Sequence, residues 1–158
     1  MMRYVSSTST GSLNFYLLCT AVLLSFYDTV STIMSTKAIG YSYEGNVIIR
    51  EVIHRAGVMG FAGVKFSVTF LALFVAYYII RHKADLGWEN VKMFYGIYAG
   101  TAVSSFFVAT SNLSVVYAGS SFYFLDLNSL HIGLLLLFTA PVAGFLLDII
   151  SSQKEPGT

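Results

Sequence analysis

The sequence predicts an all-α integral membrane protein, with four transmembrane helices and a short interfacial amphipathic helix between the first and the second. Apolar residues make up 56% of the 158 residues and charged residues only 11%, whereas about 25% of a typical soluble domain is charged. Four apolar runs each reach the ~20 residues that a helix needs to cross a hydrocarbon layer. A chain this short cannot bury so much apolar surface within itself, so we expect its outer surface to face lipid.

The predicted spans form a single domain over residues 1–158, and they lie at about 13–34, 58–80, 93–118 and 130–150. Within lipid, backbone N–H and C=O groups must be paired inside the protein, which a helix achieves within one segment. A β-barrel would instead need segments of about ten residues with alternating polarity, and these runs are continuous. We expect no cleaved signal peptide, because only Arg3 precedes the first run and no small-residue cleavage site follows it.

The segment between the first two runs separates its apolar and polar residues onto two sides of a helix. Over residues 47–55, Ile48 and Ile53 share one side with other apolar residues, whereas the charged residues lie on the other. Asn46 is a suitable N-cap and Gly57 a suitable stop. We expect an amphipathic helix that lies in the membrane interface, and the alternative is a helix docked on the soluble surface of a partner.

Lysine and arginine residues in the short loops indicate the orientation, because cytoplasmic loops are enriched in them. The loop 81–92 contains Arg81, Lys83 and Lys92, whereas the loop 119–129 contains no lysine or arginine. We therefore expect the loop 81–92 to be cytoplasmic, with both termini inside, in a multi-pass protein of the cell membrane. Three basic residues oppose this pattern, because they would lie outside: Lys37, Arg50 and Arg55.

Small residues predict where helices pack closely. They recur at every fourth position of the third and fourth spans, at Gly96, Gly100, Ser104, Ala140 and Gly144. Such rows let two backbones approach closely within lipid. The two rows either face each other or face another subunit, and the sequence leaves both arrangements open.

Two ionisable residues lie within the first two predicted spans, where a charge is expensive. Asp28 lies about six residues from the outer end of its span, or ~9 Å at 1.5 Å per residue, and Lys65 lies at a similar depth. We therefore expect a buried Asp28–Lys65 ion pair, in which each charge relieves the desolvation of the other. We favour a structural role in packing the two helices over a proton or cation pathway or a catalytic pocket, because no complete catalytic constellation lies nearby.

Further polar residues are expected near the same outer leaflet, where they would line one pocket. This intramembrane polar cluster comprises Asp28, Thr32, Glu44, Asn46, Lys65, Asn112, Asp126, Asn128 and His131. Its candidate metal ligands, together with His54, have no metal-binding spacing such as H-E-x-x-H. Asp126, Asn128 or Ser129 is equally suited to cap the fourth helix. We therefore expect no metal site, no cofactor and no catalytic residue.

Part of this pattern resembles a known family. Asp28-Thr-Val-Ser-Thr32, Glu44-Gly-Asn46 and Lys65 resemble a motif in a widespread family of small, uncharacterised prokaryotic membrane proteins, in which a Glu-x-Asn-Pro element follows the first helix. The resemblance covers roughly residues 1–80 and departs at Val47, where that family usually has proline. It implies no activity. It implies that these residues form a single spatial unit.

Three classes of function remain, and we place a small non-catalytic accessory subunit of a larger membrane complex, such as a respiratory or oxidase assembly, first. The alternatives are a small transporter or channel that uses Asp28 and Lys65, and an intramembrane enzyme with a polar site at the outer leaflet. No G-x-S-x-G, P-loop or G-x-G-x-x-G motif is present. We expect the lipid bilayer and other membrane subunits as partners. A net charge of +1 without a basic tract gives no reason to expect nucleic acid.

Overall fold

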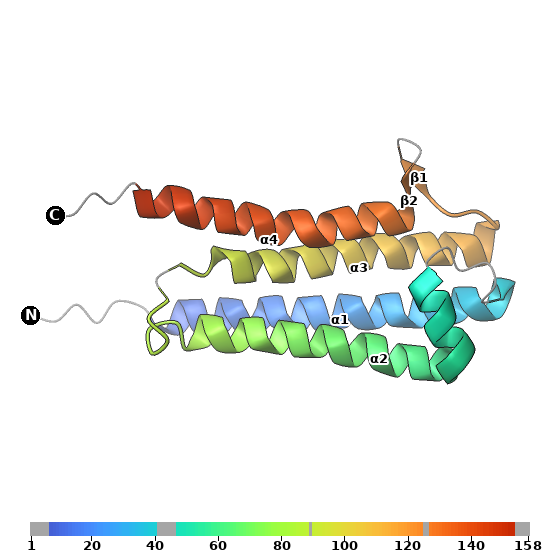
Figure 1. Cartoon of the computed structure of the whole chain (residues 1–158), viewed down its shortest axis with the longest axis horizontal. Coiled ribbons are helices and arrows are strands. Elements are labelled where there is room, and N and C mark those ends of the chain that lie inside the picture. The colour runs from blue at the N-terminus through green and yellow to red at the C-terminus, as the bar shows by residue number, and fades with distance from the viewer. Residues whose placement is uncertain (1–6, 41–46, 89, 125–126, 154–158) are drawn as a thin grey trace, which may run out of the picture.

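The structure is a computed structural model that describes residues 7–40, 47–88, 90–124 and 127–153. Within these residues it contains four helices and one short hairpin (Figure 1), namely α1 (Ser7–Ile39), α2 (Val47–Arg81), α3 (Lys92–Ala118), β1 (Tyr123–Phe124), β2 (Leu127–Asn128) and α4 (Ser129–Gln153). All four helices of the described part are long and apolar enough to cross a membrane. The predicted fold class is confirmed at this level, and the chain is consistent with a multi-pass membrane protein.

Two features differ from the expected elements. The first helix continues to Ile39, whereas the predicted span ends at Met34. Polar residues follow Met34, and they lower the hydropathy of the sequence. They are nevertheless buried between helices, so the helix continues through them. Ser35, for example, is 8% exposed and donates its hydroxyl to the carbonyl of Thr32 at 3.1 Å. The antiparallel β1–β2 hairpin was not expected either.

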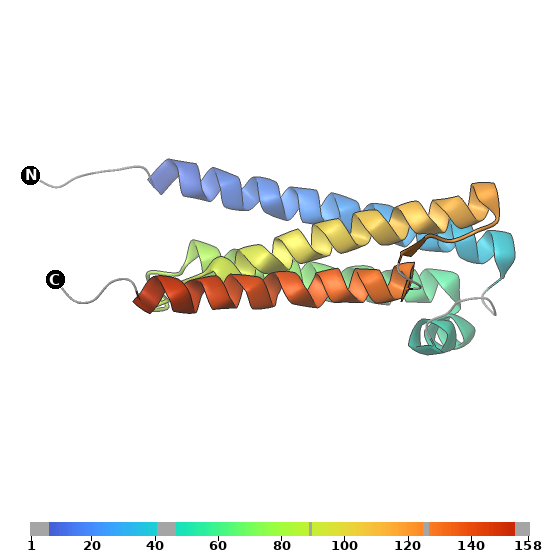
Figure 2. The same cartoon turned by 90° about the horizontal axis from the view of Figure 1, so that it is seen from above.

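α2 is broken at Gly57, where the sequence predicted a helix stop. Gly57 has φ 71° and ψ 170°, a backbone conformation that residues with a Cβ rarely adopt. The arm that precedes it, residues 47–56, turns away from the axis of the rest of α2 (Figure 2). Ile53 is the buried residue of this arm, at 4% exposure. The segment predicted to be amphipathic is therefore helical and differs in direction from the rest of α2.

Successive helices run in opposite directions, so that α1 begins and α4 ends at the same end of the molecule (Figures 1 and 2). α3 lies centrally, because it packs along both α1 and α4 and also contacts α2. α1 packs against α2 as well. Among the described residues, α3 is the single helix that α4 contacts. The helices therefore form an open array rather than a closed bundle.

The contact between α3 and α4 depends on glycines that allow the two backbones to meet. A Cβ atom at Gly96 would lie 2.4 Å from the carbonyl oxygen of Ala140, and a Cβ atom at Gly144 would lie 2.4 Å from that of Lys92. Both contacts are with backbone atoms, which cannot move aside easily. The close approach therefore requires glycine at both positions.

The other small residues lie in the same interface. Gly100 faces the carbonyl oxygen of Leu137, and Ser104 faces Gly133. Pro141 is four residues after Leu137 within α4 and has no N–H to donate to that oxygen. The carbonyl that proline leaves unpaired in the helix therefore lies against Gly100. The structure thus brings the two small-residue rows together within one chain.

α1 is mostly polar where it is buried and carries large apolar residues where it is exposed. Apart from Ala21, its buried residues are polar, namely Asn14, Ser25, Asp28, Thr29, Ser31, Thr32, Ser35 and Thr36. Its opposite side exposes Leu23 and Phe26, which are 67% and 57% exposed. This distribution is the reverse of that in a helix of a water-soluble protein. It fits a helix whose outer side contacts lipid.

Candidate functional site: the Asp28 and Lys65 cluster

The site is built around an ion pair between α1 and α2. Nζ of Lys65 lies 2.8 Å from Oδ2 of Asp28, and the two side chains are 21% and 10% exposed. The expected ion pair is thus present. The ammonium group also lies 5.8 Å from the centroid of the Phe61 ring, one turn earlier on α2, where the negative face of the ring attracts a cation. The lysine is therefore held from two sides.

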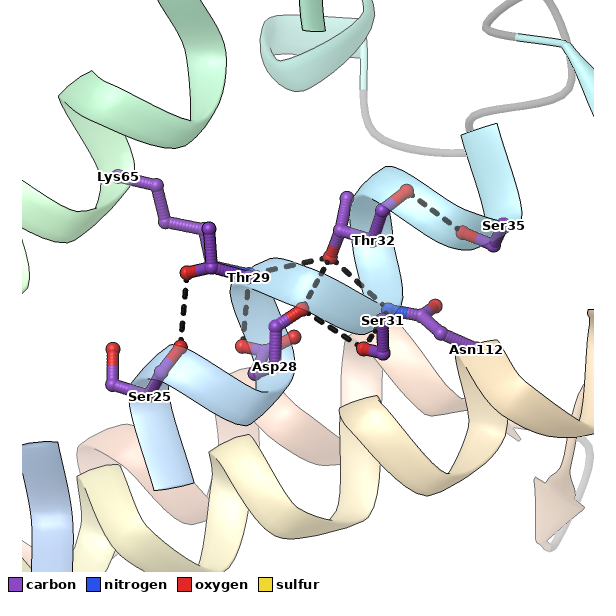
Figure 3. Close-up of polar contacts among 8 residues, drawn as sticks. All are labelled: Ser25, Asp28, Thr29, Ser31, Thr32, Ser35, Lys65 and Asn112. Atoms are coloured by element: carbon purple, nitrogen blue, oxygen red, sulfur yellow. Dashed lines mark hydrogen bonds and ion pairs between the residues drawn. The ribbon is translucent and has the colours of Figure 1, made fainter. Parts of the chain in front are cut away.

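Thr32 and Asn112 extend this pair to α3 (Figure 3). Nζ of Lys65 lies 3.5 Å from the hydroxyl oxygen of Thr32. The side-chain amide of Asn112 donates to the same oxygen at 3.1 Å and to the hydroxyl oxygen of Ser31 at 3.2 Å. One polar network therefore connects α1, α2 and α3, and four of the predicted cluster residues lie within it.

The hydroxyl groups of α1 donate to the carbonyls of their own helix. Ser31 and Thr32 both donate to the backbone oxygen of Asp28, at 2.8 and 2.9 Å, and Thr29 donates to that of Ser25 at 2.9 Å. These bonds use the hydroxyl protons and leave oxygen lone pairs facing the interior. The surroundings of the ion pair are consequently rich in acceptors.

One oxygen of the central carboxylate has no partner. Oδ1 of Asp28 is buried, and no hydrogen-bond donor reaches it from the described residues. Its sister oxygen Oδ2 holds Lys65. Buried polar atoms in native proteins are nearly always paired, so an unpaired carboxylate oxygen at the centre of a polar network points to a further interaction.

The other predicted cluster residues take different places or lie outside the described part. Oδ1 of Asn128 accepts the backbone N–H of His131 at 3.1 Å, so Asn128 caps α4. His131 is exposed at the start of a groove on the outer side of α4. Three residues lie outside the described residues: Glu44, Asn46 and Asp126. Within the described part, no three His, Cys, Asp or Glu residues are grouped as metal ligands would be.

A second polar contact within the bundle was missed by the sequence analysis. Asn14 is 2% exposed; its Oδ1 accepts the hydroxyl of Tyr98 at 2.9 Å, and its amide donates to the backbone oxygen of Tyr77 at 3.3 Å. It joins α1, α2 and α3 toward the other end of α1. An asparagine inside an apolar run was the available signal, because a lone polar residue in lipid needs a partner.

A third polar contact links the ends of α3 and α4. The carboxylate of Asp148 accepts the backbone N–H groups of Lys92 and Met93, each at 3.2 Å, and Asp148 is 8% exposed. The first N–H groups of a helix have no partner within it. Asp148 of α4 therefore caps α3, a role that the sequence analysis did not assign to it.

Comparison with known proteins gives a family but no activity. Residues 19–118, well over half of the chain, match the model of a family described as "Domain of unknown function (DUF5658)". Neither the curated proteins nor the solved structures contain a significant match. The matched residues include Asp28, Lys65 and Asn112 and exclude α4. The chain belongs to this family of unknown function, whose matched region contains the whole Asp28–Lys65–Asn112 network.

Proposed function

We propose that the chain is a small non-catalytic accessory subunit of a larger membrane protein complex. The observation that carries the proposal is the packing of α4. This helix rests on α3 alone among the described helices. A groove along its outer side is lined by its own residues, namely His131, Leu134, Leu135, Phe138, Thr139, Val142, Ala143 and Leu146.

This outer side has the character of a helix-binding surface. Phe138 is 66% exposed and projects beside Thr139 and Ala143, which are small and lie one turn apart. Apolar residues gain nothing by leaving lipid for a similar surface, so helix association in a membrane depends on close packing. One transmembrane helix of a partner could pack closely against Thr139 and Ala143, with Phe138 beside it.

The internal polar groups support a structural rather than a catalytic role. Asp28 and Lys65 lie in direct contact and connect α1 to α2, and Asn14 and Tyr98 connect α1 to α3. Each contact satisfies charges or polar atoms that would otherwise be costly in lipid. We infer that they hold three helices together, leaving α4 to the partner.

A photo-crosslinking experiment in the source membranes tests the subunit proposal. A photoreactive amino acid at Phe138 on α4 is expected to give one cross-linked partner band, identified by mass spectrometry after native electrophoresis. The matched control is Leu71 on α2, which is 63% exposed, close to the 66% of Phe138. Equal cross-linking to lipid from both positions, with the chain migrating alone, would overturn the proposal.

We also propose that the 47–56 arm lies in the membrane interface and that both termini are cytoplasmic. α2 ends and α3 begins at the end of the molecule where α1 begins (Figure 1), and the connection between them carries Arg81, Lys83 and Lys92, which supports this orientation. A membrane-impermeant maleimide should label Ser120→Cys but not Asp85→Cys in intact cells, in a Cys19→Ser background. The reverse labelling would contradict the orientation. A spin label at Ile48 that lipid-soluble relaxation agents cannot reach would contradict the interfacial position.

A small transporter is the second candidate function, and the unpaired Oδ1 of Asp28 is the observation that favours it. Transport across a membrane needs a site where a solute replaces an internal partner. Reconstituted vesicles that show a cation flux in the native protein, and none in a normally folded Asp28→Asn variant, would favour transport over the subunit role. Equal flux in both would remove this candidate.

A further inference from the structure

The two carboxylate oxygens of Asp28 have different surroundings. Oδ2 is 2.8 Å from Nζ of Lys65, whereas Oδ1 is buried without a donor among the described residues. A carboxylate spreads its charge over both oxygens and accepts hydrogen bonds at each. The carboxylate is therefore only partly neutralised, and Oδ1 remains available to a positively charged or donating ligand.

The protons of three neighbouring side chains are already used in other hydrogen bonds. The hydroxyl protons of Thr29 and Ser31 are used by carbonyls of α1. Asn112 has two amide protons, and both are used by the hydroxyl oxygens of Ser31 and Thr32. These three side chains therefore offer oxygen lone pairs to a cation that displaces the ammonium group of Lys65, which is the donor at the centre of the cluster (Figure 3).

The ammonium group of Lys65 has other partners that can stabilise it when a cation binds the Asp28 carboxylate. Its Nζ already lies 3.5 Å from the hydroxyl oxygen of Thr32 and 5.8 Å from the centre of the Phe61 ring. Both groups stabilise an ammonium ion. The Lys65 side chain is also 21% exposed, so the protein does not enclose it completely.

We propose that Asp28 is a binding site for a monovalent alkali cation of the sodium type, which is bound through Oδ1 and competes with the ammonium group of Lys65. The charge favours a monovalent ion, because Ca²⁺ sites in proteins usually combine several carboxylates, and Asp28 is the one carboxylate among the eight residues drawn in Figure 3. The inference goes beyond the subunit proposal and does not depend on it.

Radioactive sodium binding and thermal unfolding of the purified full chain in lipid nanodiscs test this site. At constant ionic strength, exchange of choline chloride for sodium chloride is expected to raise Tm saturably, since a ligand that binds the folded state stabilises it. Lys65→Met removes the competitor. We expect the sodium concentration at half-saturation to fall by roughly tenfold, which corresponds to about 1.4 kcal/mol.

Matched variants decide the outcome. Asp148→Asn removes a carboxylate of similar burial outside the network, since the whole residues Asp148 and Asp28 are 8% and 7% exposed. This variant should retain the sodium dependence of Tm. Asp28→Asn with Lys65→Met leaves no unpaired charge at the site and should lose both sodium binding and the Tm shift. The proposal is overturned if the native chain and Lys65→Met bind no sodium, or if the double variant binds it as the native chain does.

Discussion

The hydroxyl group of Tyr98 on α3 donates a hydrogen bond of 2.9 Å to the side-chain oxygen of Asn14 on α1. Both residues are almost fully buried, at 1% and 2% exposure. The amide of the same asparagine reaches the backbone of α2 at Tyr77. Together with Asp28 and Lys65, this contact gives α1 two polar attachments to its neighbours, one toward each end of the helix.

Removal of the Tyr98 hydroxyl is expected to destabilise the folded chain modestly. Tyr98→Phe keeps the ring in place and leaves Oδ1 of Asn14 without its donor. Hydrogen bonds between transmembrane helices contribute about 0.6 kcal/mol on average and up to ~1.7, so we expect a loss of roughly 1 kcal/mol in the free energy of unfolding. Unfolding in mixed micelles measures it. Tyr117→Phe, at a position 79% exposed, is the control, and an equal loss in both would contradict the role of this bond.

Hydropathy predicted the four helices well, because a segment that crosses a membrane must be apolar along about 20 consecutive residues. It was less informative about polar contacts. The Asp28–Lys65 pair followed from the similar depth of two charges, whereas Asn14 was overlooked, because one neutral polar residue hardly lowers the hydropathy of an apolar run. Its partner Tyr98 is one of several aromatic residues in the third span, and nothing in the sequence distinguishes it from the others. Only the packing of α1 on α3 identifies the pair.

The small-residue rows show a related limit. Gly96 and Gly144 recur with spacing that predicts close helix contact, but the spacing does not identify the partner helix. The structure pairs them with Ala140 and Lys92 of the same chain. The cap that Asp148 forms on α3 was not predicted either, because it joins residues more than fifty positions apart. Such a contact depends on where the helix ends meet.

Loss of the Asp148 carboxylate is expected to weaken the start of α3. Asp148→Ala leaves the backbone N–H groups of Lys92 and Met93 without their acceptor. Removal of a helix cap costs about 0.5–2 kcal/mol, and we expect a loss of that size in unfolding free energy. Hydrogen exchange of these amides should also accelerate. Asp85→Ala, in a loop where the side chain is 81% exposed, should change neither quantity, and a similar effect there would count against the cap.

A methyl group at Gly96 is expected to separate α3 from α4. The new Cβ would lie 2.4 Å from the backbone oxygen of Ala140, so the helices must shift for Gly96→Ala to fold. Overpacking of this kind typically costs about 1–3 kcal/mol. Gly63→Ala is the matched control, because no atom beyond its chain neighbours and the nearby backbone of its own helix lies within 4 Å of its Cβ position, and alanine favours a helix by up to about 1 kcal/mol. A neutral Gly96→Ala in the unfolding assay would show that the two helices are not in contact there.

A double-mutant cycle separates the two roles of the Asp28–Lys65 pair. Removal of one partner leaves a buried charge uncompensated, which costs about 3–5 kcal/mol, whereas replacement of both by apolar residues of similar size is often close to neutral. In sodium-free buffer, Asp28→Leu and Lys65→Met should each reduce the free energy of unfolding strongly, and the double variant should recover most of the loss. That recovery would mean that apolar packing can replace the stability that the pair supplies, so that the charges themselves reflect ligand binding or selection of one helix arrangement. A double variant as unstable as the two single losses combined would show instead that Asp28 and Lys65 stabilise the fold through separate contacts, with Thr32 and Phe61 as the remaining partners of Lys65.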